Sequence, residues 1–255
     1  MKYLKTVAQQ LKKNTLCIDA DLYLYRAAAA AENETDWGND IFSLSTDLKE
    51  AKEIFTNQVE NFKKELKVDQ VLMCISSTTN FRKSVYKPYK SGRKKVRKPV
   101  GHAALVTWCK ETYPSIVQET LEADDVMGIL ASDPNAQAKR IIVSDDKDMK
   151  TIPGQLYRPF DGELFEITLQ EADRHFYTQC LTGDTTDGYP GLPGVGPVKA
   201  NKILGSRPDW SLVQNAYTKA GLNQGEALDQ ARCARILRFT DWDFTNDKVK
   251  LWSPR

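Results

Sequence analysis

Histidine is scarce in this sequence of 255 residues, which contains only His102 and His175. Two isolated histidines argue against a histidine-based catalytic or metal site. The cysteines form no CxxC pair and have no histidine at metal-ligand spacing; they are Cys17, Cys74, Cys109, Cys180 and Cys233. We therefore expect free, buried thiols in a reducing compartment rather than disulfides or a zinc site.

Long apolar runs are also missing. No segment is long and apolar enough to span a bilayer, and the first residues lack the continuous apolar stretch of a signal peptide. The hydrophobic fraction of 41% and the charged fraction of 27% are typical of folded globular proteins. A chain of this length forms one large domain or two modest ones, so we expect a soluble, cytoplasmic protein with a substantial core.

Acidic residues are absent from one stretch of the chain. Between Arg82 and Lys98 there are nine basic residues and no acid, although the net charge of the whole chain is only +2. Elsewhere the acids gather in short groups. A basic segment together with separate acidic groups indicates that one part of the protein binds phosphates and another part binds metal.

Aromatic residues are interleaved with the cations of this basic segment. Tyr86 or Tyr89 can stack on a nucleic-acid base, and Lys90 and Arg93 can contact one phosphate group. The alternative is a solvated basic loop or helix face. The complete lack of acids in the segment favours nucleic-acid binding.

The pattern of apolar runs predicts an α/β fold with a mostly parallel sheet, because strand-like runs alternate with helical patterns. Strands are expected at residues 15–18, 70–75, 115–117, 140–143, 155–158 and 164–167, and helices at 47–66 and 123–131. The composition changes near residue 180, after which glycine-rich turns and helices follow with no clear strand. We predict an α/β domain over residues 1–180 and a helical region over residues 181–255.

Four groups of acids lie where this fold would bring them together. Asp19 ends the first expected strand, and Asp146 directly follows the strand at 140–143. The carboxyl ends of parallel strands face one crevice, and a helix that starts there would present Glu122 and Asp125 on one face. The candidate metal ligands are Asp19, Glu122, Asp124, Asp125, Asp146, Asp148, Asp184 and Asp187.

Each of these acids alone is better explained as a turn or cap residue than as a metal ligand. Together, however, converging carboxylates repel one another and need cations. Oxygen ligands without histidine or cysteine favour Mg²⁺ or Mn²⁺. Two such ions about 4 Å apart can hold the attacking water and the leaving oxygen of a phosphodiester. The acids therefore predict metal-dependent phosphodiester hydrolysis.

The segment GLPGVGPVKANKIL is a second nucleic-acid signal, because its glycines permit a tight turn and a proline begins the helix that follows. The free amide groups at such a helix start bind a phosphate, and lysines add positive charge. The candidate DNA contacts in this segment are Gly191, Gly194, Gly196, Lys199 and Lys202.

These stretches together resemble the 5′ nuclease superfamily, which includes flap endonucleases, the 5′ nuclease domain of bacterial DNA polymerase I and phage 5′→3′ exonucleases. The matching stretches are CIDAD, FRKSVYKPYKSGR, LEADD, SDDKD and GDTTDGYPGLPGVGPVKANKIL. The compact chain looks most like a phage 5′→3′ exonuclease, which would act in the host cytoplasm. The resemblance implies a PIN-like α/β fold, a helical arch near residues 82–115 and a helix–two-turn–helix that grips DNA.

The resemblance also implies roles for individual residues. The eight acids fall on the family's metal-site acids, and Lys90 and Arg93 fall on arch-base residues that contact the scissile phosphate. The residues expected to contact DNA in and near the arch are Arg82, Lys83, Tyr89, Lys94, Lys95, Arg97 and Lys98. The DNA grip would also hold a K⁺ ion, as it does in relatives.

One position departs from the family pattern. The family usually has an aspartate shortly before the FR pair, where this chain has Ser76 and Ser77. We expect a Mg²⁺-dependent, structure-selective 5′→3′ DNA exonuclease or flap endonuclease. It would act near 5′ ends of duplex, flapped or nicked DNA, and on RNA primers in RNA–DNA hybrids, during phage DNA replication or degradation. The alternatives are a PIN-type ribonuclease and a catalytically weakened protein that binds DNA junctions.

Overall fold

A six-stranded sheet lies at the centre of the computed structural model, which describes residues 4–92 and 97–254. The strand order is β5-β4-β1-β6-β7-β8, and only β8 pairs antiparallel with its neighbour. The strands are β1 (Thr15–Asp19), β4 (Gln70–Cys74), β5 (Ser115–Ile116), β6 (Arg140–Val143), β7 (Gly154–Arg158) and β8 (Glu163–Ile167). The mostly parallel α/β sheet expected from the sequence is confirmed.

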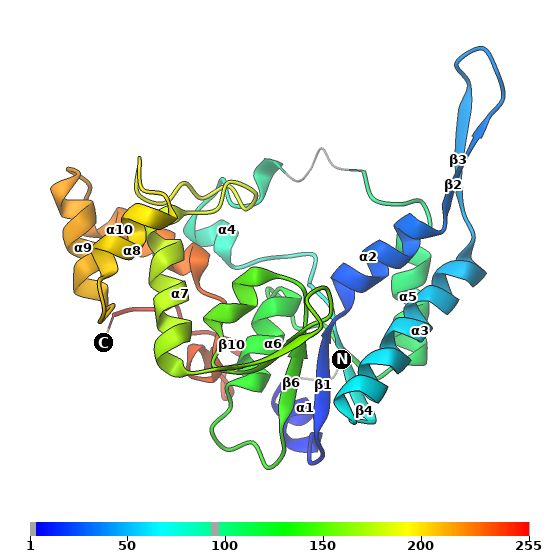
Figure 1. Ribbon diagram of the computed structural model, residues 1–255, viewed down its shortest axis with the longest axis horizontal. Helices are drawn as coiled ribbons and strands as arrows, with labels where there is room; N and C mark the ends of the chain where they lie inside the picture. The colour runs from blue at the N-terminus through cyan, green and yellow to red at the C-terminus, as the bar shows by residue number, and fades with distance from the viewer. Residues whose placement is uncertain (1–3, 93–96, 255) are drawn as a thin grey trace.

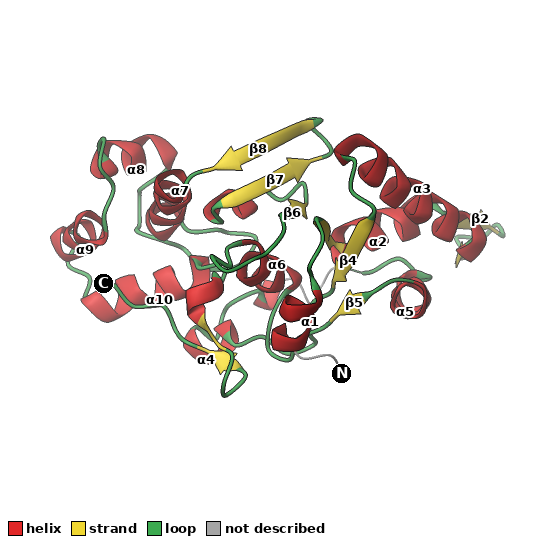
Figure 2. Ribbon diagram, turned by 90° about the horizontal axis from the view of Figure 1, so that it is seen from below, coloured by secondary structure: helices red, strands yellow, loops and turns green. Residues whose placement is uncertain are grey.

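Helices cover both faces of this sheet because its central strands are buried on both sides (Figure 2). One face packs against α2 (Ala20–Ala30), α3 (Leu48–Leu66) and α5 (His102–Thr112), and the other packs against α1 (Leu4–Gln10) and α6 (Ala123–Ala131). Along β1 the side chains alternate: Leu16 and Ile18 belong to the first of these cores and Cys17 to the second.

The C-terminal helices form a third core of their own. They are α7 (Leu169–Thr182), α8 (Pro197–Leu204), α9 (Trp210–Lys219) and α10 (Gln224–Ala234). The boundary that we expected between residues 180 and 181 falls inside α7, and the division into two regions stays a prediction. Beyond α10 lie η3 (Phe239–Asp241) and a small antiparallel pair, β9 (Trp242–Asp243) and β10 (Lys248–Val249), where we had expected no strand.

An unexpected hairpin joins α2 to α3. Its strands, β2 (Glu32–Asp36) and β3 (Phe42–Thr46), project away from the body of the molecule (Figure 1). The hairpin carries Trp37, which is 68% exposed. Two contacts fix its base: the Arg97 guanidinium pairs with Glu32, and the Gly101 amide donates to Thr46 Oγ1 at 2.8 Å. The hairpin is thereby tied to the segment that leads into α5.

The segment expected to form an arch begins with α4 (Arg82–Val85) and ends with α5. These two helices lie on opposite sides of the sheet edge (Figure 1). Within the described residues, no helix combines the length and the apolar character that crossing a membrane requires. All five cysteines are buried and free, as expected.

Candidate active site

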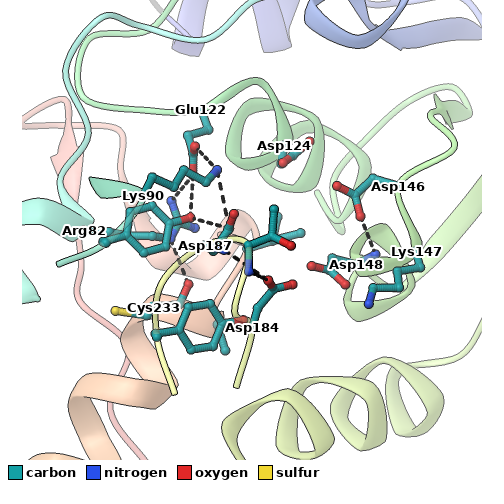
Figure 3. Close-up of a pocket in the computed structure, with 15 residues that line it drawn as sticks. Arg82, Lys90, Glu122, Asp124, Asp146, Lys147, Asp148, Asp184, Asp187 and Cys233 are labelled. Carbon is teal, nitrogen blue, oxygen red and sulfur yellow. Dashed lines mark hydrogen bonds and ion pairs between the residues drawn. The ribbon is translucent and has the colours of Figure 1, made fainter. Parts of the chain in front are cut away.

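A polar cavity of about 240 Å³ lies at the edge of the sheet where the parallel strands end. Acids from α6, from the segment after β6 and from the loop after α7 line it (Figure 3). Six of the eight predicted metal ligands are among the lining residues: Glu122, Asp124, Asp146, Asp148, Asp184 and Asp187. The fold therefore brings together carboxylates that are far apart in the sequence.

The other two predicted ligands are more deeply placed. Asp19 is the last residue of β1 and 6% exposed, and its Oδ1 accepts the Leu22 amide as the N-cap of α2. Its Oδ2 accepts the Ser144 hydroxyl at 2.8 Å. Asp125 is fully buried, and both of its oxygens are bonded to Arg82. Asp19 is close enough to the cavity acids to repel them electrostatically, whereas Asp125 faces a cation.

On one side of the cavity, cations neutralise the carboxylates. Lys90 Nζ forms an ion pair with Glu122 and lies 3.5 Å from Asp187 Oδ2. Arg82 Nη1 lies 3.2 Å from Glu122 Oε2. Burial by itself would raise the pKa of Glu122, but the charges of Arg82 and Lys90 lower this pKa to about 2. We call Glu122, Asp125 and Asp187 with their cations the compensated side.

On the other side, four acids have no such partner. Within the described residues, Asp19, Asp124, Asp146 and Asp148 form no ion pair with lysine or arginine. Burial and mutual repulsion raise the pKa of Asp19 and of Asp148 to about 7, and raise that of Asp124 well above its ordinary value. We call these four acids the uncompensated side.

The donor set of the uncompensated side fits a hard divalent ion. All its donors are carboxylate oxygens, and a bound cation would relieve their repulsion. In the described part of the chain, however, no three acidic, histidine or cysteine side chains are already placed to ligate one ion. Mg²⁺ keeps several of its waters and is held by one or two carboxylates, so a complete protein cage is not required.

Arg82 is buried where α4 meets α6 and the end of α10, and not on the surface. It is 2% exposed, and all five of its N–H donors have acceptors. The acceptors include the carboxylate of Asp125 and the backbone carbonyls of Cys233 and Arg235. This placement favours a structural role over the DNA contact that we expected.

Tyr89 is also buried, with 3% of its surface exposed. Its hydroxyl lies 2.9 Å from Glu122 Oε2 and 3.0 Å from Asp187 Oδ2. Its ring stacks on that of Tyr189, with a centroid distance of 6.3 Å and an interplanar angle of 20°. The side chain is thus committed to the interior, which argues against its stacking on a DNA base.

The glycine-rich loop has two different parts. Gly191 has a φ of +65°, and a Cβ there would meet the Gly183 nitrogen at 2.2 Å, so only glycine fits. Gly194 and Gly196 have no atom within 4 Å of such a Cβ. They lie exposed before α8, where Lys199 Nζ donates to the Gly194 carbonyl at 2.8 Å. Lys202 is exposed on α8.

Ser76 and Ser77 follow β4, at the place where the family usually has an aspartate. The Ser76 amide donates to Asp21 Oδ2 at 2.9 Å, and Ser76 Oγ accepts the Ala123 amide at 2.9 Å. The Ser77 hydroxyl accepts the amide of Thr79 in its own turn. Asp21, in the first turn of α2, therefore places a carboxylate at this strand end. We had missed it, although it is the second acid of CIDAD.

The remaining predicted phosphate contacts belong to the segment that we expected to form an arch. Lys83 and Lys98 are exposed, and Arg97 is exposed while paired with Glu32. Arg93, Lys94 and Lys95 lie outside the described residues.

Comparison with known proteins places this geometry in a family. Residues 14–173 match the model of the 5′-3′ exonuclease, N-terminal resolvase-like domain. The chain is 30% identical to the exodeoxyribonuclease of Enterobacteria phage T3, over 95% of this chain and 94% of that protein. It is 29% identical to the exonuclease of Escherichia phage T7, with the same coverage.

Other relatives and solved structures agree with this match. The flap endonuclease Xni of Shewanella woodyi is 28% identical over 60% of this chain and 66% of its own. The T5 D15 protein co-crystallized with metal ions superposes with a TM-score of 0.63 at 12% identity, covering 88% of this chain and 89% of its own. The fold, the extent of the sequence match and the family model agree: this chain belongs to the 5′–3′ exonuclease family.

Proposed function

We propose that this 5′–3′ nuclease hydrolyses DNA phosphodiesters near 5′ ends with the help of divalent metal ions, of which Mg²⁺ is the natural choice. One observation carries the proposal: four carboxylates, of which Asp19 is buried, Asp124 and Asp148 are partly buried and Asp146 is exposed, converge at one sheet edge without an ion pair to lysine or arginine within the described residues. Divalent ions also fit the T5 relatives, two of which were crystallised with metal ions or zinc. DNA as substrate fits the name of the phage T3 relative.

In this proposal most of the acids bind metal, and one of them holds Arg82 in place. Two ions would be held by Asp19, Asp124, Asp146 and Asp148 together with Asp184, Asp187 and Glu122, and Asp21 would add a carboxylate at the end of β4. The ions would activate the attacking water and stabilise the leaving oxygen. Asp125 does not ligate metal but holds Arg82.

The chain's own cations act on the phosphate. Lys90 lies in the cavity and is the residue best placed to stabilise charge on the scissile phosphate, with Arg93 as its predicted companion. Lys83, Lys94, Lys95, Arg97 and Lys98 would guide the strand.

The exposed amides before α8, with Lys199 and Lys202, would grip the duplex backbone. A K⁺ ion at this turn and cleavage of RNA primers in hybrids complete the proposed activity. The two phage relatives favour a role in phage DNA replication or degradation in the host cytoplasm.

A cleavage assay tests the proposal against its alternatives. The protein is incubated with Mg²⁺ and end-labelled substrates: a 5′ flap, a nicked duplex, a blunt duplex, a duplex with a blocked 5′ end, an RNA–DNA hybrid and single-stranded RNA. We expect short products from the 5′ ends of the DNA substrates and none in chelator. Cleavage of single-stranded RNA alone would indicate a PIN-type ribonuclease. Tight DNA binding with no product from any substrate would indicate a junction-binding protein.

A further inference from the structure

Tyr89 and Lys90 each contact the same two carboxylates. The Tyr89 hydroxyl is within hydrogen-bonding distance of Glu122 Oε2 and Asp187 Oδ2. Lys90 Nζ pairs with Glu122 Oε1 and Asp187 Oδ2 (Figure 3). The four side chains therefore form a closed ring. Its two acids come from the start of α6 and from the loop after α7, which are far apart in the sequence.

The backbone holds this ring in place. The Lys90 amide donates to the Asp187 carbonyl at 2.7 Å, and Lys90 itself has a φ of +52°, which is unusual for a residue with a side chain. Tyr89 is fixed by its burial and by its stacking on Tyr189. The base of the arch and the loop that carries Asp187 thus form one unit.

The two hydrogen-bond donors of the ring, Tyr89 and Lys90, differ in charge. Lys90 brings a positive charge to two carboxylates that a divalent ion would also use, so the two cations would repel each other if both were bound there. Tyr89 is neutral and offers a single proton, which supports the arrangement without competing for charge. Their effects on metal binding should therefore have opposite signs.

We propose that Lys90 is a resident cation, which holds Glu122 and Asp187 in the metal-free protein and competes with a divalent ion for them. Tyr89 is the positioning residue that keeps the same two carboxylates at their separation. This proposal rests on the proposed metal-dependent function and adds a consequence to it. With a divalent ion at Glu122 and Asp187, Lys90 would no longer be held by these carboxylates, and its charge would be available to the substrate phosphate.

Binding of Mg²⁺ in the absence of DNA tests the proposal without any turnover. Isothermal titration calorimetry compares the wild type with Lys90→Met, which keeps the length of the side chain and removes its charge. We expect Lys90→Met to bind Mg²⁺ about tenfold more tightly, because the ion then no longer competes with the lysine ammonium for Glu122 and Asp187. Tyr89→Phe should bind about threefold more weakly, because the two carboxylates lose a shared donor.

Lys147→Met is the matched control. Lys147 lines the same cavity and acts electrostatically on Asp148, but in the described part of the chain it forms no ion pair with an acid. Its removal should change Mg²⁺ affinity by less than about threefold, as expected for a screened charge. Equal tightening in Lys90→Met and Lys147→Met would overturn the proposal, because then only the general charge of the cavity matters.

Two further results keep the test decisive. Lys90→Arg keeps the charge and should bind Mg²⁺ no more tightly than the wild type, which provides the comparison if Lys90→Met does not fold. Unchanged or weaker binding by a folded Lys90→Met, or tighter binding by Tyr89→Phe, would refute this inference alone. A wild-type protein that binds no Mg²⁺ and cleaves equally well in chelator would instead refute the proposed metal-dependent function.

Discussion

The compensated and uncompensated sides of the cavity are built from the same kind of side chain but are in opposite electrostatic states. Glu122 has two cations beside it and a pKa lowered to about 2, so it is ionised at any physiological pH. Asp19 and Asp148 have burial and other acids beside them, and their pKa values are raised to about 7. The number of acids alone therefore does not define a metal site.

This difference shows which carboxylates stabilise the metal-free fold and which need a bound cation. A buried carboxylate with a bidentate guanidinium, such as Asp125, is already satisfied and stabilises the metal-free fold. A partly buried carboxylate among other carboxylates, such as Asp124, destabilises the fold until a cation binds. Substitutions on the two sides should accordingly change the stability of the metal-free protein in opposite directions.

The largest expected effect comes from the compensated side. Arg82→Met should lower the free energy of unfolding by about 3–5 kcal/mol, because Asp125 is left buried without its cation. Urea unfolding followed by circular dichroism measures the change. The double variant Arg82→Met/Asp125→Leu removes both charges and should regain most of the loss. If the double variant is no more stable than Arg82→Met, the ion pair is not what holds this region together.

The next effect comes from the uncompensated side. Asp124→Asn should slow Mg²⁺-dependent cleavage at least about a hundredfold, because a metal-binding oxygen loses its charge. The same variant should melt at a higher temperature than the wild type when metal is absent. Asp40→Asn, in the projecting hairpin, is the matched control, because asparagine also adopts its φ of +59°. Near-normal cleavage by Asp124→Asn would remove this acid from the proposed metal site.

A smaller effect links pH to metal binding. Because the pKa values of Asp19 and Asp148 are about 7 in the fold against 3.8 for a free aspartate, ionisation of these groups opposes folding. Their contribution to stability is therefore greatest below pH 3.8 and falls as the pH rises through about 7. Glu122 has the opposite sign: its contribution is present above pH 4.5 and is lost towards pH 2.

Calorimetry in buffers of different ionisation enthalpy measures the protons released when Mg²⁺ binds. We expect about two protons per protein at about pH 6, one each from Asp19 and Asp148, and none from these two groups at about pH 9, since the ligands must lose their protons to bind metal. No proton release at the lower pH would mean that Asp19 and Asp148 are already ionised, and the contrast between the two sides would then be weaker.

The smallest effect concerns the glycine-rich turn and leaves both sides of the cavity intact. Lys199→Ala and Lys202→Ala should each lower the slope of log affinity for duplex DNA against log salt by about one. Fluorescence anisotropy at several salt concentrations measures the slope. Lys219→Ala removes a lysine from the end of a different helix, α9, and serves as the comparison. An unaltered slope in both α8 variants would show that α8 does not contact phosphates.

The sequence predicted the sheet well because its central strands are buried on both faces and stand out as apolar runs. The expected strand at 140–143 and helix at 123–131 agree with β6 and α6 residue for residue. The hairpin of β2 and β3 was missed because almost all its residues are exposed. Its second strand does alternate apolar and polar residues, with Phe42 and Leu44 separated by a serine, but its first strand, ENETD, has no apolar residue, so the two strands did not stand out as a hairpin.

Within the site, the positions of the acids could be predicted, but their partners could not. Asp19 and Asp146 follow from the rule that parallel strands end at one edge. Nothing local to Arg82 or Tyr89 indicates burial, because their partners, such as Cys233, lie far away in the sequence. Their basic and aromatic surroundings pointed to DNA, whereas long-range packing placed both inside the protein.

The bonds of Arg82 have a consequence for how the enzyme is made. Arg82 and Asp125 leave the ribosome well before Cys233 and Arg235, whose carbonyls accept two of the five guanidinium hydrogen bonds. Domains generally begin to fold from the N-terminal side during synthesis. The sheet can therefore form on the ribosome while one wall of the cavity is still missing. A partly synthesised chain would therefore contain the acids of the cavity before the residues that complete its wall, and we expect nuclease activity only after synthesis has passed α10.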